Sequence, residues 1–418
     1  MEYRKRIIDE ILKDTLSYRG GVLIEGLKWC GKTTSAKQIA ASSILMSESE
    51  PFEVYLSGNM KPILQGSVPR LIDEWQLAPR LWDEVRNEID RRSIFGQFIL
   101  TGSSVSPDRE KIMHTGTGRI SRLLMRTMSL YESEDSNGDV SLGAMFDGQV
   151  EISGSSDIDI DRLAFLVSKG GWPGALALDD RQALKSAEDL YKQTINDDIV
   201  REGKIKRDAE RVDNFMRSYA RHQGTQATNA VLSEDIVSGK AIDPDTAAAY
   251  TNALENIFVV ENLPAWNPNL RSRTAVRTSP TRYFSDPSFA VEALGTGPSG
   301  LLKDLRTFGF IFETMCIRDL RIYADALDGR VFHYRDKSNL ECDAVIVLRD
   351  GRYALIEIKL GGEERIEEGA CNLKRLQKQL DTDRMNTPSF MMVLTGITKY
   401  AYRRRDGIYV VPVGCLRN

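Results

Sequence analysis

The sequence predicts an α/β protein made of a parallel-stranded domain, a mostly helical domain and a smaller α/β domain. Apolar strand-like runs alternate with helix-like segments in the first part of the chain, helical patterns dominate residues 161–300, and a helix followed by strand-like runs ends the chain. The 418 residues are enough for two or three separate cores. We expect the domains to span residues 1–155, 156–300 and 301–418.

Composition and net charge limit the classes of protein to which this chain can belong. Hydrophobic residues make up 41% of the chain and charged residues 28%, as in an ordinary globular protein. The net charge of −4 argues against a uniformly basic nucleic-acid binder but leaves room for local basic patches. There is no apolar run of membrane-spanning length, Met1–Glu10 lacks the apolar core of a signal peptide, and the five cysteines have no disulfide or zinc-site spacing. We therefore expect a cytoplasmic protein with no membrane partner.

The clearest functional motif is the glycine-rich stretch that begins at Gly26. It has the spacing of a phosphate-binding loop, with an apolar run before it and a helix-like run after it. Its glycines let backbone N–H groups turn towards phosphate oxygens, Lys32 supplies a cation, and the Thr33 hydroxyl can bind Mg²⁺. The alternative is a strand-to-helix turn that binds nothing. We predict an ATP and Mg²⁺ site with contacts from Gly26, Leu27, Lys28, Trp29, Cys30, Gly31, Lys32, Thr33 and Thr34.

An acidic pair follows the short apolar run Leu71-Ile72, as in the second motif of phosphate-loop ATPases. We expect Asp73 to support the Mg²⁺ shell and Glu74 to orient and polarise the attacking water. The other interpretation is a solvated strand end or a helix cap. The neighbouring elements are expected to be a helix over Met1–Tyr18, a strand at Phe52–Leu56 and a helix through Leu81–Ile89.

A third apolar run, Phe98–Leu100, ends in small hydroxyl residues. In ATPases of the AAA type, which this order of motifs resembles, a polar residue at this place contacts the γ-phosphate or the water. The resemblance implies Ser103 in this role, with Thr101 as second candidate, and a plain strand-to-loop turn is the alternative. Further on, Arg119 or Arg122 can neutralise transition-state charge in its own subunit or a neighbouring one, or can be a solvated surface charge.

The middle of the chain begins with a stretch whose charged residues are all acidic. Between Glu132 and Asp161 there are nine acidic residues and no Lys or Arg, which predicts a mobile connector or an exposed excursion. Helix-like segments follow, broken at Gly170–Gly174. A basic strand–turn–strand run comes next, with Arg271, Arg273, Arg277 and Arg282. Helices followed by a basic hairpin suggest a winged helix, whose arginines would either meet nucleic-acid phosphates or pack against another domain.

The carboxyl-terminal region places charged residues within apolar runs. Glu357 and Lys359 lie two apart on one strand-like run and therefore share a face. Asp343 lies on the preceding run, and Glu313 lies in an apolar helix. Such charges are costly to bury unless they are paired or bind a metal. A three-residue turn at Arg349–Gly351 would place Asp343 opposite Glu357, whereas a two-residue turn would separate them; we predict the three-residue turn.

This spacing resembles the site of divalent-metal nucleases of the PD-(D/E)xK type, in which acidic residues hold Mg²⁺ and a lysine helps to activate water. The resemblance implies that Glu313, Asp343 and Glu357 are metal ligands and that Lys359 activates water. The alternative is a structural Lys–Glu pair in a nuclease-like sheet that has lost its chemistry.

Taken together, the chain resembles a widespread prokaryotic family of AAA-type ATPases whose C-terminal half is catalogued as a domain of unknown function. The resemblance rests on GLKWCGKTT, LIDEWQLAP, FILTGSS, GTGR, GGWPG, YFSDPSFA and ECDAVI…IEIK, which span nearly the whole chain. It implies a P-loop AAA-type ATPase domain, a helical winged-helix domain and a small nuclease-like domain. The chain departs from the family at Trp29-Cys30 in the loop and in its long acidic segment.

Two functions follow from these expectations. The first is a Mg²⁺-dependent ATPase that couples its nucleotide state to the carboxyl-terminal half, with DNA as a candidate partner and a homo-oligomer as a candidate assembly. The second is a nucleotide-gated binding or switch protein whose nuclease-like domain is inactive and serves protein interaction.

Overall fold

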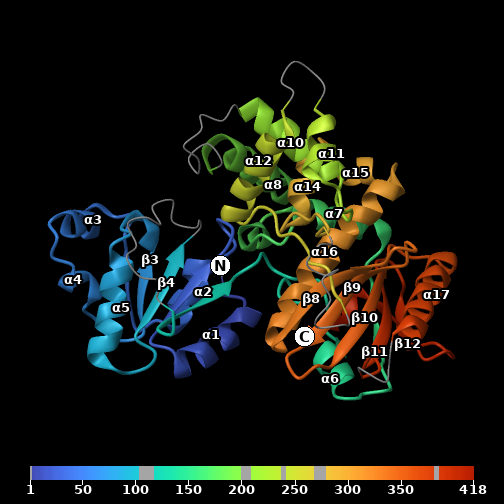
Figure 1. Ribbon diagram of the computed structural model, residues 1–418, viewed down its shortest axis with the longest axis horizontal. Helices are drawn as coiled ribbons and strands as arrows, with labels where there is room; N and C mark the ends of the chain where they lie inside the picture. Colours follow the sequence, from blue (N-terminus) through green and yellow to red (C-terminus); the bar gives the residue numbers. More distant parts are fainter. Residues whose placement is uncertain (1, 103–116, 199–208, 237–241, 268–278, 381–385) are drawn as a thin grey trace. The chain divides into compact units, whose positions relative to one another are not determined.

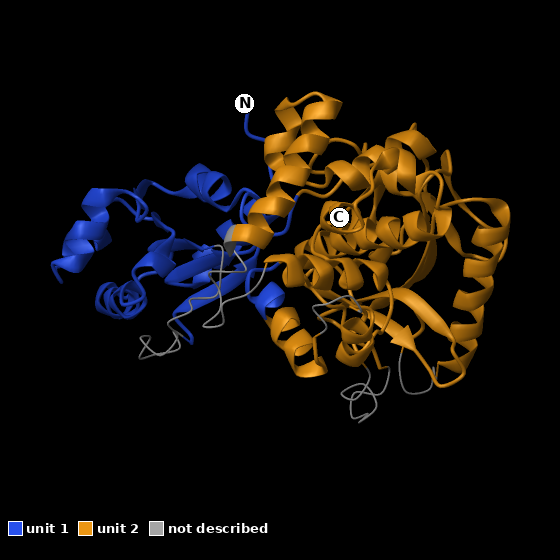
Figure 2. Cartoon of the chain, turned by 90° about the horizontal axis from the view of Figure 1, so that it is seen from above, with its two compact units in different colours: residues 1–127, 201–205, 253–258 blue, residues 128–200, 206–252, 259–418 orange. Residues whose placement is uncertain are grey.

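The computed structural model describes residues 2–102, 117–198, 209–236, 242–267, 279–380 and 386–418 (Figure 1). The chain divides into two compact units (Figure 2). Unit 1 comprises residues 1–127, 201–205 and 253–258, and unit 2 comprises residues 128–200, 206–252 and 259–418. Residues 128–155, which we assigned to the first domain from the sequence, group with unit 2. Among the described residues, no helix is long and apolar enough to cross a membrane.

Unit 1 is built on a five-stranded parallel sheet with the order β2-β3-β4-β1-β5. Its strands are β1 (Gly21–Glu25), β2 (Ser42–Leu45), β3 (Arg70–Asp73), β4 (Phe98–Gly102) and β5 (Ile120–Leu124). Because all five run in the same direction, their carboxyl ends meet at one edge, where open α/β sheets bind their ligands. The motifs of the sequence analysis follow β1, β3 and β4 at this edge.

The helices of unit 1 cover the sheet around an apolar core. They are α1 (Ile7–Tyr18), α2 (Lys32–Ile39), α3 (Ser49–Leu56), α4 (Lys61–Leu64) and α5 (Leu81–Arg92), with a 3₁₀ turn η1 (Trp75–Leu77). The core includes Leu23, Ile72 and Leu100 from the strands and Trp82 from α5. The prediction of a strand at Phe52–Leu56 is wrong, because these residues end helix α3. The second strand is instead β2, whose half-exposed side chains give only a weak apolar signal.

Unit 2 contains a seven-stranded sheet with the order β7-β12-β13-β11-β10-β9-β8. Its elements from the end of the chain are β8 (Gly329–Arg335), β9 (Glu341–Leu348), β10 (Tyr353–Lys359), α17 (Glu363–Gln379), β11 (Phe390–Thr395), β12 (Tyr400–Arg403) and β13 (Tyr409–Pro412), followed by a short β14 (Leu416–Arg417). Helix α17 packs its apolar side on this sheet, where Leu355 and Val393 meet Ile366 and Leu373. Strands β9 and β10 are the strand-like runs that the sequence predicts around Asp343 and Glu357, whereas the sequence predicts neither β12 nor β14.

The acidic segment forms a short helix and short strands within unit 2, although residues 147–151 are exposed. It forms β6 (Val140–Ser141), α6 (Leu142–Phe146) and β7 (Gly154–Ser155). Strand β6 pairs with β14, and β7 pairs with β12. Two of the acidic groups have close partners: Asp135 pairs with Arg162 at 2.8 Å and with Lys169 at 3.0 Å, and Glu132 accepts a hydrogen bond from the Ser129 N–H. The basic partners lie outside the acidic stretch, so its composition alone gives no sign of them.

Helices make up most of the remainder of unit 2. They are α7 (Ile160–Lys169), α8 (Asp180–Gln193), α10 (Ala209–Arg221), α11 (Asn229–Glu234), α12 (Pro244–Asn256), α14 (Pro287–Ala293), α15 (Pro298–Leu301) and α16 (Leu305–Ala326), with the last residues of α12 grouped in unit 1. Helix α16 contains the apolar helix that the sequence predicts around Glu313.

The winged helix remains a prediction. Residues 260–263 form antiparallel bridges with residues 281–284, which agrees with the predicted strand–turn–strand run. Arg271, Arg273 and Arg277 lie outside the described residues. Arg282 is buried and donates to the Ala227 carbonyl and to Asn229 Oδ1, each at 3.0 Å. The contacts of Arg282 thus lie within its own predicted domain, and they show neither of the two roles considered for these arginines.

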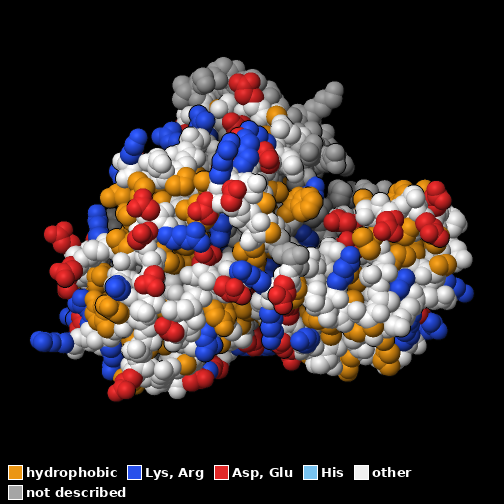
Figure 3. All heavy atoms as spheres, turned by 180° about the vertical axis from the view of Figure 1, so that it is seen from behind, with side chains coloured by type: hydrophobic (Ala, Val, Ile, Leu, Met, Phe, Trp, Pro, Cys, Tyr) orange, Lys and Arg blue, Asp and Glu red, His pale blue; other side chains and the backbone are white. Residues whose placement is uncertain are grey.

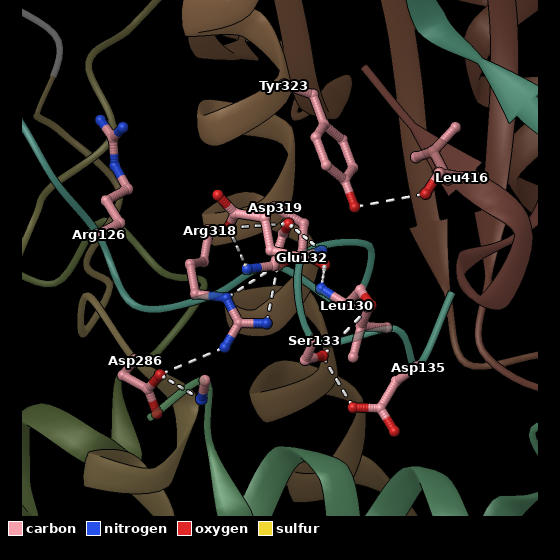
Figure 4. Close-up of polar contacts among 12 residues, drawn as sticks. Arg126, Leu130, Glu132, Ser133, Asp135, Asp286, Arg318, Asp319, Tyr323 and Leu416 are labelled. Carbon is pink, nitrogen blue, oxygen red and sulfur yellow. Dashed lines mark hydrogen bonds and ion pairs between the residues drawn. The ribbon is translucent and has the colours of Figure 1, made fainter. Parts of the chain in front are cut away.

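A buried ion cluster joins separate segments of unit 2 (Figure 4). The Arg318 guanidinium, only 2% exposed, lies 3.2 Å from Asp286 and 2.8 Å from Asp319. Asp286 also accepts a hydrogen bond from the Gly171 N–H, and Asp319 accepts one from the Leu130 N–H, each at 2.9 Å. Arg318 thus links three segments to α16. They are the start of α14, the residues that follow α7, and the segment that contains Leu130.

The glycines of the GGWPG motif allow this close packing. Gly170 has φ 71°, and a Cβ added there would lie 2.3 Å from Asp286 Oδ1. A Cβ on Gly171 would lie 2.2 Å from the Met128 carbonyl oxygen. Neither position accepts a larger residue without displacing its neighbour.

The surface shown in Figure 3 carries both basic and acidic side chains. Basic and acidic side chains are interspersed on the visible face, over both units, rather than separated into a broad basic area and a broad acidic one. This agrees with the small net charge of −4.

Candidate functional sites

The glycine-rich loop connects β1 to α2 at the carboxyl edge of the unit 1 sheet. Gly26 has φ 149°, and a Cβ added there would lie 2.1 Å from the Met125 carbonyl oxygen. Gly31 precedes α2 with φ 107°, a backbone conformation that residues other than glycine rarely adopt. Trp29 also has a positive φ of 65°, and its side chain is 69% exposed. The loop thus has the local geometry that its sequence predicts.

Lys32 lies inside this loop. It is 6% exposed, and its Nζ donates hydrogen bonds to the carbonyls of Gly26 at 2.9 Å and of Leu27 at 2.6 Å. The ammonium group is therefore held against the backbone of the loop at the amino end of α2. A cation and a helix N-terminus at one place make a site for a polyanion.

Two hydroxyl groups converge on Asp73. The Thr33 Oγ1 donates to Asp73 Oδ1 at 2.7 Å, and Thr101 Oγ1 donates to the same oxygen. A hydroxyl beside a carboxylate is an oxygen donor set that Mg²⁺ accepts, so Thr33 and Asp73 fit the predicted metal role. Thr101, the second candidate for contact with the γ-phosphate, instead has its hydroxyl turned towards Asp73.

Glu74 has an unusual backbone conformation. Its φ of 55° and ψ of 42° lie in the left-handed region, which is uncommon for residues other than glycine and costs of the order of 1 kcal/mol. The 3₁₀ turn Trp75–Leu77 follows directly, and the Gln76 Nε2 donates to Glu74 Oε2. The carboxylate is thus held at the end of β3, beside Asp73.

The structure separates Arg119 from the phosphate loop of its own chain. Arg119 precedes β5, and its carbonyl accepts a hydrogen bond from the Gly21 N–H at the start of β1. The loop follows the other end of β1, and a strand of five residues spans about 16 Å. Arg119 pairs with Asp90 at 3.0 Å. A role in its own ATP site is therefore wrong, and a catalytic role is compatible only with a site on another copy.

Ser103 and Arg122 are the other two residues of this region that are candidates for the ATP site. Ser103 lies outside the described residues. Arg122 is about half exposed and pairs with Glu25, the last residue of β1, at 2.9 Å.

Sequence reasoning missed the contacts of the amino-terminal segment with the loop. Arg6 is buried and donates to the carbonyl of Cys30 through Nη1 and to that of Arg126 through Nη2, both at 2.9 Å. Tyr3 OH lies 2.8 Å from Ser35 Oγ of α2. No motif marks these residues, because one arginine in a charged amphipathic segment looks like any surface residue.

The second group of charged residues lies in unit 2, and the hairpin register is as predicted. Ala344 pairs with Ile356, so the next pair of this register is Asp343 with Glu357. The loop is Arg349–Gly351, with Gly351 at φ 89°. Lys359 Nζ lies 2.7 Å from Glu357 Oε2 and 3.3 Å from Asp343 Oδ2. One turn of the correct length thus brings three of the four predicted residues together.

Glu313 joins this group from helix α16. Tyr283 donates a hydrogen bond to Glu313 Oε1. Burial, with the nearby Asp343 charge, holds the pKa of Glu313 well above its usual value. Burial and Asp343 likewise raise the pKa of Glu357 to about 8. Burial lowers the pKa of Lys359, but Asp343 and Glu357 outweigh it, so that this pKa is raised and the lysine is charged.

The fit of this cluster to a metal ion is partial. Among the described residues, no group of three or more His, Cys, Asp or Glu side chains is arranged to hold a metal ion. Asp343 and Glu357 both turn an oxygen towards Lys359. The other oxygen of Glu357, Oε1, is buried and has no hydrogen-bond partner within the described part of the chain. That atom is suited to a metal or a hydrogen-bond donor, and the metal role of Glu313, Asp343 and Glu357 remains a prediction.

Comparison with protein families finds three matches along the chain. Residues 19–134 match a family described as an AAA domain. Residues 160–300 and 308–416 match two domains of unknown function, DUF8612 and DUF4143. No curated protein matches the sequence.

Several solved structures have some similarity to the chain. The Walker-type ATPase of Pyrococcus abyssi is 15% identical, with a TM-score of 0.42, covering 68% of this chain and 94% of that one. A point variant of RuvB from Thermotoga maritima is 16% identical, with a TM-score of 0.26 and coverages of 62% and 89%. A chain of the Drosophila ORC bound to DNA is 14% identical, with a TM-score of 0.21 and coverages of 69% and 84%.

The family match covers the same residues that form the parallel sheet, the glycine-rich loop with Lys32, and the Thr33–Asp73 pair. The amino-terminal part of the chain is therefore a nucleotide-binding P-loop ATPase domain of the AAA type.

Proposed function

We propose that the protein hydrolyses ATP with Mg²⁺ at the phosphate loop of unit 1 and couples its nucleotide state to unit 2. The observation that carries the proposal is the convergence of Thr33 and Thr101 on Asp73 beside Lys32. These groups lie at the carboxyl edge of a parallel sheet, where the loop and the acidic pair come together from β1 and β3.

Each residue has a distinct role in this proposal. The backbone N–H groups of Gly26–Thr33 and the Lys32 ammonium bind the phosphates, and the lysine offsets the charge that develops on the γ-phosphate. Thr33 and Asp73 would hold Mg²⁺, which supplies electrostatic stabilisation of the phosphate oxygens. Glu74 orients the attacking water and accepts its proton. Ser103 remains the proposed contact to the γ-phosphate.

The experiment that tests ATP binding replaces Lys32 by Ala. Loss of a charge-assisted contact to phosphate is expected to weaken ATP binding about tenfold to a hundredfold. Binding is measured by titration of the full chain with a fluorescent ATP analogue, and hydrolysis by phosphate release with Mg²⁺ and with EDTA. Replacement of the exposed Lys378 by Ala is the control and should change neither. Unchanged ATP affinity in Lys32→Ala would contradict the proposed site.

We propose as a second function the metal-dependent hydrolysis of phosphodiester bonds in DNA or RNA by the unit 2 cluster. The supporting observation is that Asp343 and Lys359, both partly buried, form one group with the buried Glu357, whose Oε1 has no hydrogen-bond partner among the described residues. Asp343 and Glu357, with Glu313, would hold the metal, which would polarise the phosphate, and the Lys359 ammonium would orient the attacking water.

Replacement of Lys359 by Met tests the second function. Cleavage of a panel of DNA and RNA substrates with Mg²⁺ or Mn²⁺ should fall about a hundredfold, because the group that positions the water is lost. Asp343→Asn should have a similar effect, and the exposed Lys378→Met should have none. If the wild-type chain cleaves nothing but shows ATP-dependent oligomerisation or partner binding, the alternative is favoured: a nucleotide-gated switch with an inactive nuclease-like domain.

A further inference from the structure

Gln76 lies in the LIDEWQLAP stretch next to the acidic pair, but the sequence assigns it no role at the ATP site. It lies in the 3₁₀ turn that follows Glu74, and its side chain is partly buried. Its Nε2 donates to Glu74 Oε2, whereas its Oε1 is buried and has no partner within the described residues. Because an ionised carboxylate can only accept hydrogen bonds, the amide nitrogen must face Glu74. The orientation of the amide is thereby fixed, and its oxygen points away from Glu74.

The amide oxygen lies over the end of β4. A Cβ added to Gly102 would lie 2.7 Å from Gln76 Oε1 and 3.0 Å from the indole Nε1 of Trp75. This Nε1 is also buried without a hydrogen-bond partner in the described part of the chain, and Trp75 is 3% exposed. The ring is fixed by packing on Trp82 at a centroid distance of 5.1 Å. One unpartnered acceptor and one unpartnered donor thus meet over Gly102, next to Thr101.

These atoms lie beside the proposed hydrolytic groups. Thr101 precedes Gly102 and donates to Asp73, and Glu74 follows Asp73. A buried polar atom without a partner is costly, so an acceptor and a donor at one place are suited to a small polar molecule that would bond to both. In an ATP hydrolase, the small polar molecule that belongs next to the general base is the attacking water.

We infer that Gln76 is a positioning residue for ATP hydrolysis, which holds Glu74 through Nε2 and accepts a hydrogen bond from the attacking water through Oε1. The inference rests on the proposed ATPase function and deepens it. The water oxygen forms a bond to the γ-phosphorus, and the bond from this phosphorus to the β–γ bridging oxygen breaks. ADP leaves with that electron pair. The water proton passes to Glu74 and then to the phosphate product, so no other reactant is needed.

The left-handed conformation of Glu74 fits this role. A strained residue persists when its surroundings hold it, and here the Gln76 amide bonds its carboxylate directly. If Gln76 only supported the turn, its polar atoms could be replaced without affecting the chemical step. If it positions the base and the water, the hydrolysis rate should depend on it while ATP affinity does not.

The test uses two variants of the full chain that keep the length of the side chain. Gln76→Glu replaces the amide donor by an oxygen, and Gln76→Met removes both polar atoms. The matched control is Gln65→Glu, which alters an exposed glutamine at the end of α4 in the same unit. Single-turnover hydrolysis of ATP and the affinity for a fluorescent ATP analogue are measured for each. We expect hydrolysis to slow about a hundredfold in both Gln76 variants, with affinity unchanged within about threefold.

A double variant separates positioning from simple structural support. If Gln76 acts through Glu74, then Glu74→Ala with Gln76→Glu should be no slower than Glu74→Ala alone, because residues that act as a unit are not additive. If the loss of hydrolysis rate in the double variant is instead the product of the two single losses, the inference is overturned. A normal or raised rate in the Gln76 variants would do so as well, and so would an equal loss of ATP affinity. A wild-type chain that hydrolyses no ATP would instead overturn the proposed function, and the inference with it.

Discussion

Replacement of Glu74 by Ala is expected to reduce ATP turnover about 10³- to 10⁴-fold while ATP remains bound. Glu74 follows β3 beside Asp73, and its carboxylate is held by Gln76. Removal of the carboxylate takes away the proton acceptor for the attacking water, but it leaves Lys32, Thr33 and the loop backbone intact. Binding and hydrolysis should therefore separate in this variant, unlike in Lys32→Ala.

Phosphate release and retained nucleotide are the two measurements for Glu74→Ala. After incubation with ATP and removal of free nucleotide, the variant should retain ATP, whereas the wild-type chain should retain mainly ADP or nothing. Glu84→Ala is the matched control, because Glu84 is an exposed acid in the first turn of α5. Hydrolysis at the normal rate in Glu74→Ala would remove this residue from the mechanism.

The largest loss of stability is expected from replacement of Arg318 by Met. Arg318 lies between the buried carboxylates of Asp286 and Asp319, and its removal takes away the counter-ion that they share. Breaking a buried ion pair in this way costs about 3–5 kcal/mol in the free energy of unfolding. Methionine keeps most of the side-chain volume, so the effect is mainly electrostatic. Urea unfolding of the full chain, followed by circular dichroism, measures it.

The pH dependence gives this prediction a second readout. Burial raises the pKa of Asp319 to about 6, although Arg318 opposes the shift. The folded state therefore holds this proton to higher pH than the unfolded chain does, and the corresponding stability is lost as the pH rises from about 4 through 6. Without Arg318, the pKa of Asp319 rises further and the loss extends above pH 6. The variant should therefore be more strongly destabilised at pH 8 than at pH 5.

The control for this experiment is Arg365→Met. Arg365 forms an exposed pair with Glu368 on α17 at 2.8 Å, and its loss should cost less than about 1 kcal/mol. Equal effects of Arg318→Met and Arg365→Met would show that the Arg318 cluster does not stabilise unit 2.

The motifs with strict spacing could be predicted from the sequence because local geometry requires their residue types. Gly26 and Gly31 have positive φ angles, and the apolar runs before the motifs are strands of one parallel sheet. The turn at Gly351 was predictable for the same reason: the side-chain period of two residues allows only one turn length that gathers Asp343 and Glu357. In both cases, the residues that determine the local structure lie within one short segment of the sequence.

Features that depend on distant partners could not be predicted in this way. Arg119 lies in a loop rich in Gly and Thr, like a catalytic arginine, but the direction of β5 places it at the far end of the sheet. The acidic segment resembles a connector because Arg162 and Lys169, which neutralise Asp135, lie beyond it. Arg6 lies in no motif, and Gln76 lies in LIDEWQLAP without a role that its residue type predicts. Their contacts depend on the packing of residues that the sequence keeps apart.

The pairing of β6 and β7 with strands near the end of the sequence has a practical consequence. Ser155 pairs with Tyr400 at the edge of the seven-stranded sheet, and Val140 pairs with Leu416 in a separate two-stranded sheet, so residues that precede the middle helices pair with both carboxyl-terminal strands. A fragment cut to begin at residue 308, where the matched family begins, would leave β12 as an uncovered sheet edge that invites aggregation. Cloning for isolated expression should therefore begin ahead of β6, and the long loop between these partners should slow refolding.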